Sequence, residues 1–324
     1  MLYLDKVYGQ VEIKEPVILD LINCPTLNRL KDIDQAGYIE PFIANVSYSR
    51  FEHSLGVYIL LKKYNAPIQE QIAGLIHDVS HSAFSHCVDY LLSSEQAHLQ
   101  KHQDNIFETF VKNSEIPEIL YEHGYEIDYI LNDNNFPLKE KSLPDLCADR
   151  IDYFLRTLAT HNELELVNYL LDNLIVVDNN WLFKGVNSAK AFADNFFIFN
   201  KDYCSGIPSA LMFKTVTDYL AQAIKKGYIV EKDLYTTDKQ VLTKINNHLT
   251  SDPELQIYFN RMNNKIKWSN DPTDFDFKIS LKSRAVNPLC YDKKQIKKLS
   301  DLYPNWLKTV EQELKPKDYF LKIG

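Results

Sequence analysis

The chain has 324 residues, of which 45% are hydrophobic and 25% charged, a composition that is ordinary for a globular protein with a large core. Its 36 lysines and arginines are outnumbered by 44 aspartates and glutamates, so a net charge of −8 excludes a global basic field for nucleic acid or an anionic membrane. No apolar run reaches the length of about 18 residues that a membrane span needs. The five cysteines are scattered without C-x-x-C spacing, which indicates reduced thiols, and we expect a cytoplasmic protein.

Helical periodicity and only nine glycines predict a mainly α fold. We expect a short strand within Val11–Leu19, and then helices over Thr26–Gly37, Phe51–Tyr64, Ile68–His81, Asp89–Leu92, Asn105–Lys112, Leu143–Leu158, Glu163–Leu171, Ser188–Phe199, Pro208–Lys225, Asp238–Asn247 and Pro253–Met262. The polar stretch Asn132–Lys141 predicts a loop.

Two shorter signals predict β-structure in this helical chain. Two apolar runs flank the turn residues Asp178, Asn179 and Asn180, which predicts a small β-hairpin. The alternating segment Phe275–Ser283 predicts a C-terminal edge strand. We expect residues 1–175 to form the core and residues 176–324 a helical extension packed on it, as one structural unit.

Histidines cluster in one part of the chain. Six of the nine lie between His53 and His102, and clustering of His with Asp is typical of metal and acid–base sites. Within this stretch, His77 and Asp78 interrupt the apolar sequence IAGLIHDV. A buried ionisable pair without partners costs several kcal/mol, and a divalent cation bound by imidazole and carboxylate would satisfy it.

Three motifs stand in order along the chain: R-F-E-H-S-L-G from Arg50, H-D-V-S-H-S-A-F-S-H from His77, and A-D-R-I-D-Y-F from Ala148. Together they resemble the HD superfamily of metal-dependent phosphohydrolases, and most closely its deoxynucleotide triphosphohydrolase branch. The earlier segment LNRLKDIDQAG resembles the first helix of that branch. The likeness covers Val11–Leu158 and is weaker afterwards, although KSRAVNPL resembles the family's C-terminal strand. It implies an HD-domain helical bundle.

The resemblance also implies roles for individual residues. It implies that one divalent metal ion is held by His53, His77, Asp78 and Asp149. It implies acid–base or positioning work for His81, His86, Asp89 and His102. It implies that phosphates or sugar are approached by Arg50, Arg150 and Tyr153. Such ligands accept manganese, iron, cobalt, nickel, zinc or magnesium.

Three departures from the family pattern bear on the substrate. Gln103 follows His102 where relatives carry Glu, and Thr157 stands where relatives often have Asp. The helix expected to clamp a triphosphate, Cys204–Val216, offers only Lys214 as a cation. The site therefore favours a phosphohydrolase with a depleted polyphosphate clamp.

Structural alternatives stay open for several of these residues. His81, His86 and Asp89 could support the site without taking part in catalysis. Arg150 and Arg156 could pair with carboxylates along their own helix. The aromatic run Ala191–Phe199 predicts core packing in preference to a base-stacking platform.

The function that follows is metal-dependent hydrolysis of a phosphoester in a nucleotide, with a deoxynucleoside triphosphate as one candidate. Alternatives are a nucleotide monophosphatase or phosphodiesterase, and a catalytically weak protein that binds a nucleotide and regulates through oligomerisation. A di-iron oxygenase on the same scaffold is a further alternative, which would need additional histidines as ligands of two iron ions. The expected partners are a nucleotide or another phosphorylated small molecule, with a homo-oligomeric assembly and no nucleic acid or membrane.

Overall fold

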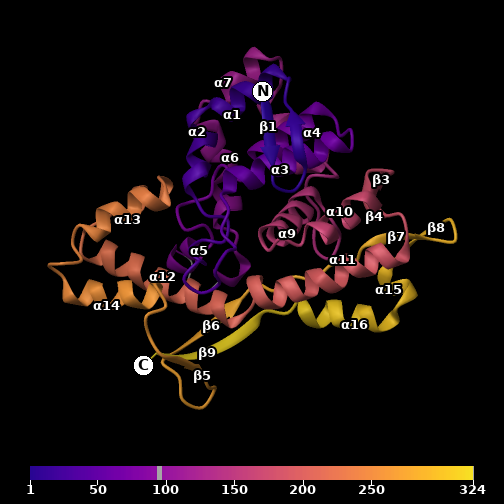
Figure 1. Ribbon diagram of the computed structural model, residues 1–324. Coiled ribbons are helices and arrows are strands. Elements are labelled where there is room, and N and C mark those ends of the chain that lie inside the picture. Colours follow the sequence, from indigo (N-terminus) through magenta and orange to yellow (C-terminus); the bar gives the residue numbers. More distant parts are fainter. Residues whose placement is uncertain (93–96, 324) are drawn as a thin grey trace.

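The computed structural model describes residues 1–92 and 97–323 and shows a mainly helical protein with three small sheets (Figure 1). The helices are α1 (Pro16–Asn23), α2 (Pro25–Asn28), α3 (Arg50–Lys63), α4 (Ile68–Ile76), α5 (Cys87–Leu92), α6 (His102–Lys112), α7 (Ile116–Glu122), α8 (Ile127–Ile130), α9 (Ala148–Thr160), α10 (Leu164–Asn173), α11 (Val186–Phe199), α12 (Ile207–Lys225), α13 (Asp238–Asn246), α14 (Pro253–Met262), α15 (Leu299–Leu302) and α16 (Pro304–Glu313). The predicted mainly α fold class is confirmed.

The strands form three separate sheets. They are β1 (Leu2–Asp5), β2 (Gly9–Glu12), β3 (Leu174–Val177), β4 (Asn180–Phe183), β5 (Trp268–Asn270), β6 (Phe277–Leu281), β7 (Leu289–Asp292), β8 (Gln295–Lys298) and β9 (Lys317–Ile323). The predicted hairpin is β3–β4, and its turn residues Asp178 and Asn179 have positive φ angles. The predicted edge strand is β6, which pairs with β9 at the edge of the sheet ordered β5-β9-β6.

Helix α3 forms the centre of the site-bearing half of the molecule. It begins with a capping box, in which Ser49 Oγ accepts from the Glu52 N–H and Glu52 Oε2 accepts from the Ser49 N–H. Helices α4 and α9 both pack against it. One core cluster joins α3 and α9 to the aromatic run of α11, where Phe192 and Phe196 are fully buried. The core role predicted for that run is confirmed.

The C-terminal half covers this centre from the other side. In Figure 1, α11 and α12 cross the middle of the molecule, with the N-terminal helices above and β6 and β9 below. Helix α12 packs against both α5 and α14, so it links the histidine-rich segment to the end of the chain. In the described part of the chain, each helix is too short or too polar to cross a bilayer.

Two helix boundaries near the motifs differ from the predictions. Helix α4 ends at Ile76, so the prediction of a helix that continues to His81 is wrong, and His77 and His81 do not share a helical face. It ends there because the His77 Nδ1–H donates to the carbonyl of Gly74 and tight turns follow. Helix α9 begins at Ala148 instead of Leu143, since Cys147 is extended and the Ala148 N–H donates to the Leu138 carbonyl.

The segment Thr26–Gly37 also differs from its predicted single helix. It contains the end of α2 and a short 3-10 turn over Arg29–Asp32, and Gly37 has φ +102°. A side chain at Gly37 would also meet the Phe84 carbonyl, so the glycine allows the chain to turn close to the histidine-rich segment.

Candidate metal centre

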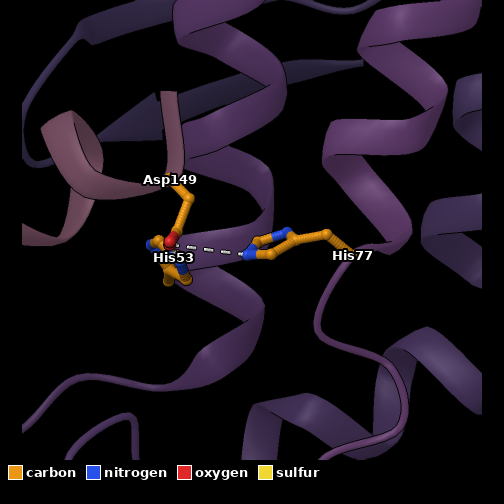
Figure 2. Close-up of side chains that lie close together, drawn as sticks. All are labelled: His53, His77 and Asp149. Carbon is orange, nitrogen blue, oxygen red and sulfur yellow. Dashed lines mark hydrogen bonds and ion pairs between the residues drawn. The ribbon is translucent and has the colours of Figure 1, made fainter. Parts of the chain in front are cut away.

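His53 lies in the first turns of α3 and is fully buried. Its Nε2 lies 2.9 Å from Oδ1 of Asp149, which Figure 2 shows beside it. Its Nδ1 lies 2.8 Å from Asp152 Oδ2. Burial disfavours the charged ring, but the hydrogen bonds to Asp149 and Asp152 prevail and raise the pKa of His53 to about 9. Without a metal, this imidazole must carry protons on both nitrogens to satisfy two carboxylates.

His77 caps the end of α4 and points toward α9 (Figure 2). Because its Nδ1–H donates to the Gly74 carbonyl at 2.8 Å, its Nε2 carries a lone pair. That buried Nε2 has no hydrogen-bond partner among the described residues. Its nearest polar neighbours are themselves acceptors, Asp78 Oδ1 at 3.4 Å and Asp149 Oδ1 at 3.7 Å. Three acceptors that face one another repel unless a proton or a metal ion lies between them. Burial disfavours the charged ring, but Asp78 and Asp149 prevail and raise the pKa of His77.

Asp149 and Asp78 supply the negative charge of this cluster. The hydrogen bond from His53 outweighs burial and holds the pKa of Asp149 well below its usual range. Burial raises the pKa of Asp78, but the neighbouring Arg50 and His77 outweigh burial and hold this pKa well below its usual range. Ligand atoms of His53, His77 and Asp149 lie within 4.8 Å of one another, and Asp78 lies beside them. Two imidazoles and two ionised carboxylates fit a divalent cation.

The structure brings His81 and His86 to the same place. His81 Nε2 lies 3.4 Å from Asp78 Oδ1, and the rings of His81 and His86 meet edge to face. Burial and the charge of Arg50 lower the pKa of His81 to about 3, so this ring is neutral. Burial also lowers the pKa of His86, despite a 3.1 Å contact between its Nδ1 and Asp89 Oδ2.

Asp89 and His102 lie behind His86, away from the cavity. Asp89 Oδ1 accepts from the backbone N–H of His102, while the His102 ring lies 3.0 Å from the Tyr235 hydroxyl. Neither side chain lines the cavity described below. Both residues can act on the cavity only through His86.

The loop that carries His81 and His86 contains two residues with positive φ angles and is held in place by hydrogen bonds to distant segments. Phe84 and Ser85 have φ angles of 60° and 48°. Arg29 donates to the carbonyls of Val79 and His81, and the Phe84 N–H donates to Asp238 Oδ1 at 2.7 Å.

A cavity of about 470 Å³ opens beside the cluster. Its walls include His77, Asp78, Asp149, His81 and His86 from the motifs, and Lys282 and Arg284 from the segment after β6. This volume falls in the range of small-molecule sites. The cavity therefore joins the histidine cluster to cations from the distant end of the chain.

The four residues predicted to bind substrate lie in different settings. Arg50, Arg150 and Tyr153 line the cavity. Arg50 is buried and donates to Asp78 Oδ2 at 2.6 Å, and Arg150 donates to the carbonyls of Asp145 and Lys141. Lys214 is not in the cavity wall; it pairs with Asp218 at 2.5 Å and lies over the Phe277 ring.

Asp152 was missed as a site residue by the sequence reasoning, which treated it only as a pairing partner on its helix. It lies three residues after Asp149, and this spacing puts both carboxylates on the face of α9 that meets α3. That spacing is the signal that could have identified it. The pairing of Arg156 with Asp152 is found, at 2.9 Å, whereas Arg150 faces backbone carbonyls.

On this helical scaffold, two histidines and two aspartates converge beside a cavity lined by both basic and acidic side chains. This donor set is typical of a metal-dependent hydrolase. The HD domain model matches residues 50–157, which span all three motifs. The uncharacterized protein YdhJ of Bacillus subtilis is 33% identical over 90% of this chain and 90% of its own length. The chain therefore belongs to the HD-domain family of metal-dependent phosphohydrolases.

Other relatives match shorter parts of the chain. The metal-dependent phosphohydrolase cns2 of Cordyceps militaris is 34% identical over 50% of this chain and 46% of its own length. The deoxynucleoside triphosphate triphosphohydrolase SAMHD1 of Danio rerio is 31% identical over 38% of this chain and 23% of its own length. This chain thus spans less than half the length of these two relatives.

Solved structures show the same fold over the whole chain. A hypothetical protein from Aquifex aeolicus gives a TM-score of 0.72 at 19% identity and covers 100% of this chain and 96% of its own. A phosphohydrolase from Bacteroides thetaiotaomicron gives a TM-score of 0.66 at 17% identity, with 99% of both chains covered.

Proposed function

We propose that this enzyme hydrolyses a phosphoester bond in a nucleotide, with one divalent metal ion held by His53, His77, Asp78 and Asp149. The observation that supports this ligand set most strongly is the buried His77 Nε2, whose lone pair faces two carboxylates and no donor. A bound divalent cation supplies Lewis-acid polarisation of a phosphoryl oxygen and a water of lowered pKa.

In this proposal, His86 is the residue that transfers a proton. Its ring lines the cavity, and Asp89 holds its Nδ1 and stabilises the ring when it is charged. His102 fixes Asp89 through its backbone N–H and so contributes indirectly. His81 is neutral and accompanies Asp78 and His86, which suits it to positioning the phosphoryl group.

A deoxynucleoside triphosphate is our leading substrate. Arg150, Lys282 and Arg284 bring three cations to the cavity, and Tyr153, Phe199 and Tyr203 give it an aromatic side that suits a nucleoside. The partial relatives named as deoxynucleoside triphosphate triphosphohydrolases agree with this choice. Lys282 and Arg284 would provide the charge that Lys214 does not.

A nucleoside monophosphate or cyclic nucleotide is the second candidate. Asp104, Asp133 and Glu140 also line the cavity, and their charge disfavours a highly anionic ligand. The Arg150 guanidinium is already engaged by two carbonyls, which limits its capacity for phosphate.

Incubation of the purified protein with Mn²⁺ and a pool of deoxynucleotides, ribonucleotides, cyclic nucleotides and monophosphates, followed by mass spectrometry, tests these proposals. Asp149→Asn removes a proposed ligand, and Asp145→Asn is a matched control on the approach to the same helix, paired only with Lys298 at the surface. Nucleoside plus intact triphosphate, lost only in Asp149→Asn, supports the leading substrate.

Other products decide between the alternatives. Release of nucleoside and orthophosphate from monophosphates would support the second candidate substrate. Metal binding without turnover of any compound in the pool refutes the nucleotide proposal. Full activity and metal binding in Asp149→Asn refute the proposed ligand set.

A further inference from the structure

The N-terminal hairpin β1–β2 reaches the back of the metal centre. The Tyr8 hydroxyl donates to Asp152 Oδ1 at 2.8 Å, and Asp152 Oδ2 accepts from His53 Nδ1–H at 2.8 Å. These two bonds connect the hairpin to a proposed metal ligand through a single carboxylate. Tyr8 and Asp152 are 144 residues apart in the sequence.

A buried arginine completes this connection. Arg156 donates to both oxygens of Asp152, at 3.0 and 2.9 Å, and its Nη2 lies 3.1 Å from Asp5 Oδ2. The other oxygen of Asp5 accepts from the backbone N–H groups of Val7 and Tyr8, at 2.8 and 3.0 Å. Asp5 therefore orients both Arg156 and the turn that carries Tyr8.

The hairpin buries Val7 in the core, but it also buries a carboxylate while two of its leucines stay exposed. Leu2 and Leu4 are 64% and 80% exposed, whereas Asp5 is only 3% exposed. A hairpin retained for packing would bury its leucines and expose its carboxylate. This one instead turns its carboxylate and a tyrosine hydroxyl toward the support of His53.

We propose that Tyr8 and Asp5 are positioning residues of the metal centre. They fix Asp152, which accepts from the His53 Nδ1–H and would leave Nε2 of that ring available to the metal. This inference rests on the ligand set proposed above. Carboxylates that hold a metal-bound histidine commonly change metal affinity about 10–100-fold when altered, and Tyr8 acts one bond further away. We therefore expect Tyr8→Phe to weaken metal binding about threefold to tenfold.

The test is a titration of the metal-stripped full chain with Co²⁺, followed by visible absorption, which reports both affinity and ligand geometry. Tyr8→Phe removes one hydroxyl, and Tyr3→Phe removes a neighbouring hydroxyl of the same hairpin that forms no hydrogen bond with the described residues. We expect a weaker dissociation constant and an altered absorption band in Tyr8→Phe, with both unchanged in Tyr3→Phe. The thermal midpoint without metal is measured for each protein.

An unchanged dissociation constant and band in Tyr8→Phe overturn the proposal, even if that variant loses thermal stability. Equal effects of Tyr3→Phe overturn it as well, because they indicate a general disturbance of the hairpin. If Tyr8→Phe does not fold, Asp5→Asn is judged by the same two measurements. His53→Ala separates the two proposals: undiminished Co²⁺ binding there refutes the ligand set itself.

Discussion

At the scale of single residues, the charge of the cavity depends on Lys282. Burial disfavours its ammonium group, the neighbouring Arg284 acts in the same direction, and together they lower the pKa of Lys282 to about 8. Asp104 and Glu140 counteract this only partly. The charge of Lys282 is therefore present below about pH 8 and is lost above it.

This pKa predicts how anion binding depends on pH. We expect inhibition by pyrophosphate to weaken between pH 7 and 9, because Lys282 becomes neutral. Lys282→Arg keeps its charge throughout this range, so the inhibition constant of the variant should depend less on pH. The ionisation of pyrophosphate itself affects both proteins equally. Parallel profiles of the inhibition constant for the two proteins would show that Lys282 does not contact the anion.

At the scale of elements, Gly56 of α3 lies against the Arg156–Asp152 ion pair of α9. A methyl group there would lie 2.0 Å from Arg156 Nη2 and 2.1 Å from Asp152 Oδ1, so the ion pair or the helices would have to shift. We predict that Gly56→Ala lowers the free energy of unfolding by about 3 kcal/mol, through overpacking and disruption of a buried ion pair. Urea denaturation measures this loss.

Gly185 provides the matched control for that substitution. It precedes α11, has an extended backbone, and has no atom within 4 Å of the position of an added methyl group. Gly185→Ala should change the free energy of unfolding by less than about 1 kcal/mol. Equal losses in the two variants would mean that the close approach at Gly56 does not matter.

The first residue of α13 stabilises the loops around the cavity from the C-terminal half. Asp238 Oδ2 accepts from the Asp34 N–H at 2.9 Å, and its Oδ1 accepts from the N–H of the strained Phe84. We expect Asp238→Ala to lower the free energy of unfolding by about 2–4 kcal/mol, because two backbone donors lose their acceptor. Lys239→Ala, at the exposed next residue, is the control in the same chemical denaturation.

At the scale of the whole molecule, the proposed ligands join α3, the end of α4 and α9. A metal ion that binds only the folded chain adds about 2.7 kcal/mol to its stability at one hundred times the dissociation constant. We expect Mn²⁺ to raise the unfolding temperature of the native chain and to have little effect on Asp149→Asn. Calorimetry with and without the metal measures this difference, and equal shifts in both proteins would contradict it.

The sequence predicted the parts of this molecule that depend on local patterns. The helices α3, α5 and α10–α14 follow from their apolar periodicity, and the β3–β4 turn follows from Asp178 and Asn179. The three motifs also identified residues that the fold brings together, since His53, His77 and Asp149 converge. Whether these residues bind the metal stays a prediction.

What the sequence did not predict depends on contacts between distant segments. The parallel pairing of β4 with β7 joins residues more than one hundred positions apart, and β1, β5 and β9 are short or mixed in character. Tyr8 gives no local sign that it meets Asp152. Helix α4 stops before His77 because a side chain takes the Gly74 carbonyl, which periodicity does not register.

The order of the cavity residues along the chain has a consequence for synthesis. The proposed ligands and the hairpin that supports them all lie before Phe154, whereas Lys282 and Arg284 come near the end of the chain. Because a ribosome releases the chain from its N-terminus, every proposed metal ligand emerges before Lys282 and Arg284 do. The proposed metal ligands are therefore complete in the nascent chain while the part of the cavity wall that carries Lys282 and Arg284 is still missing.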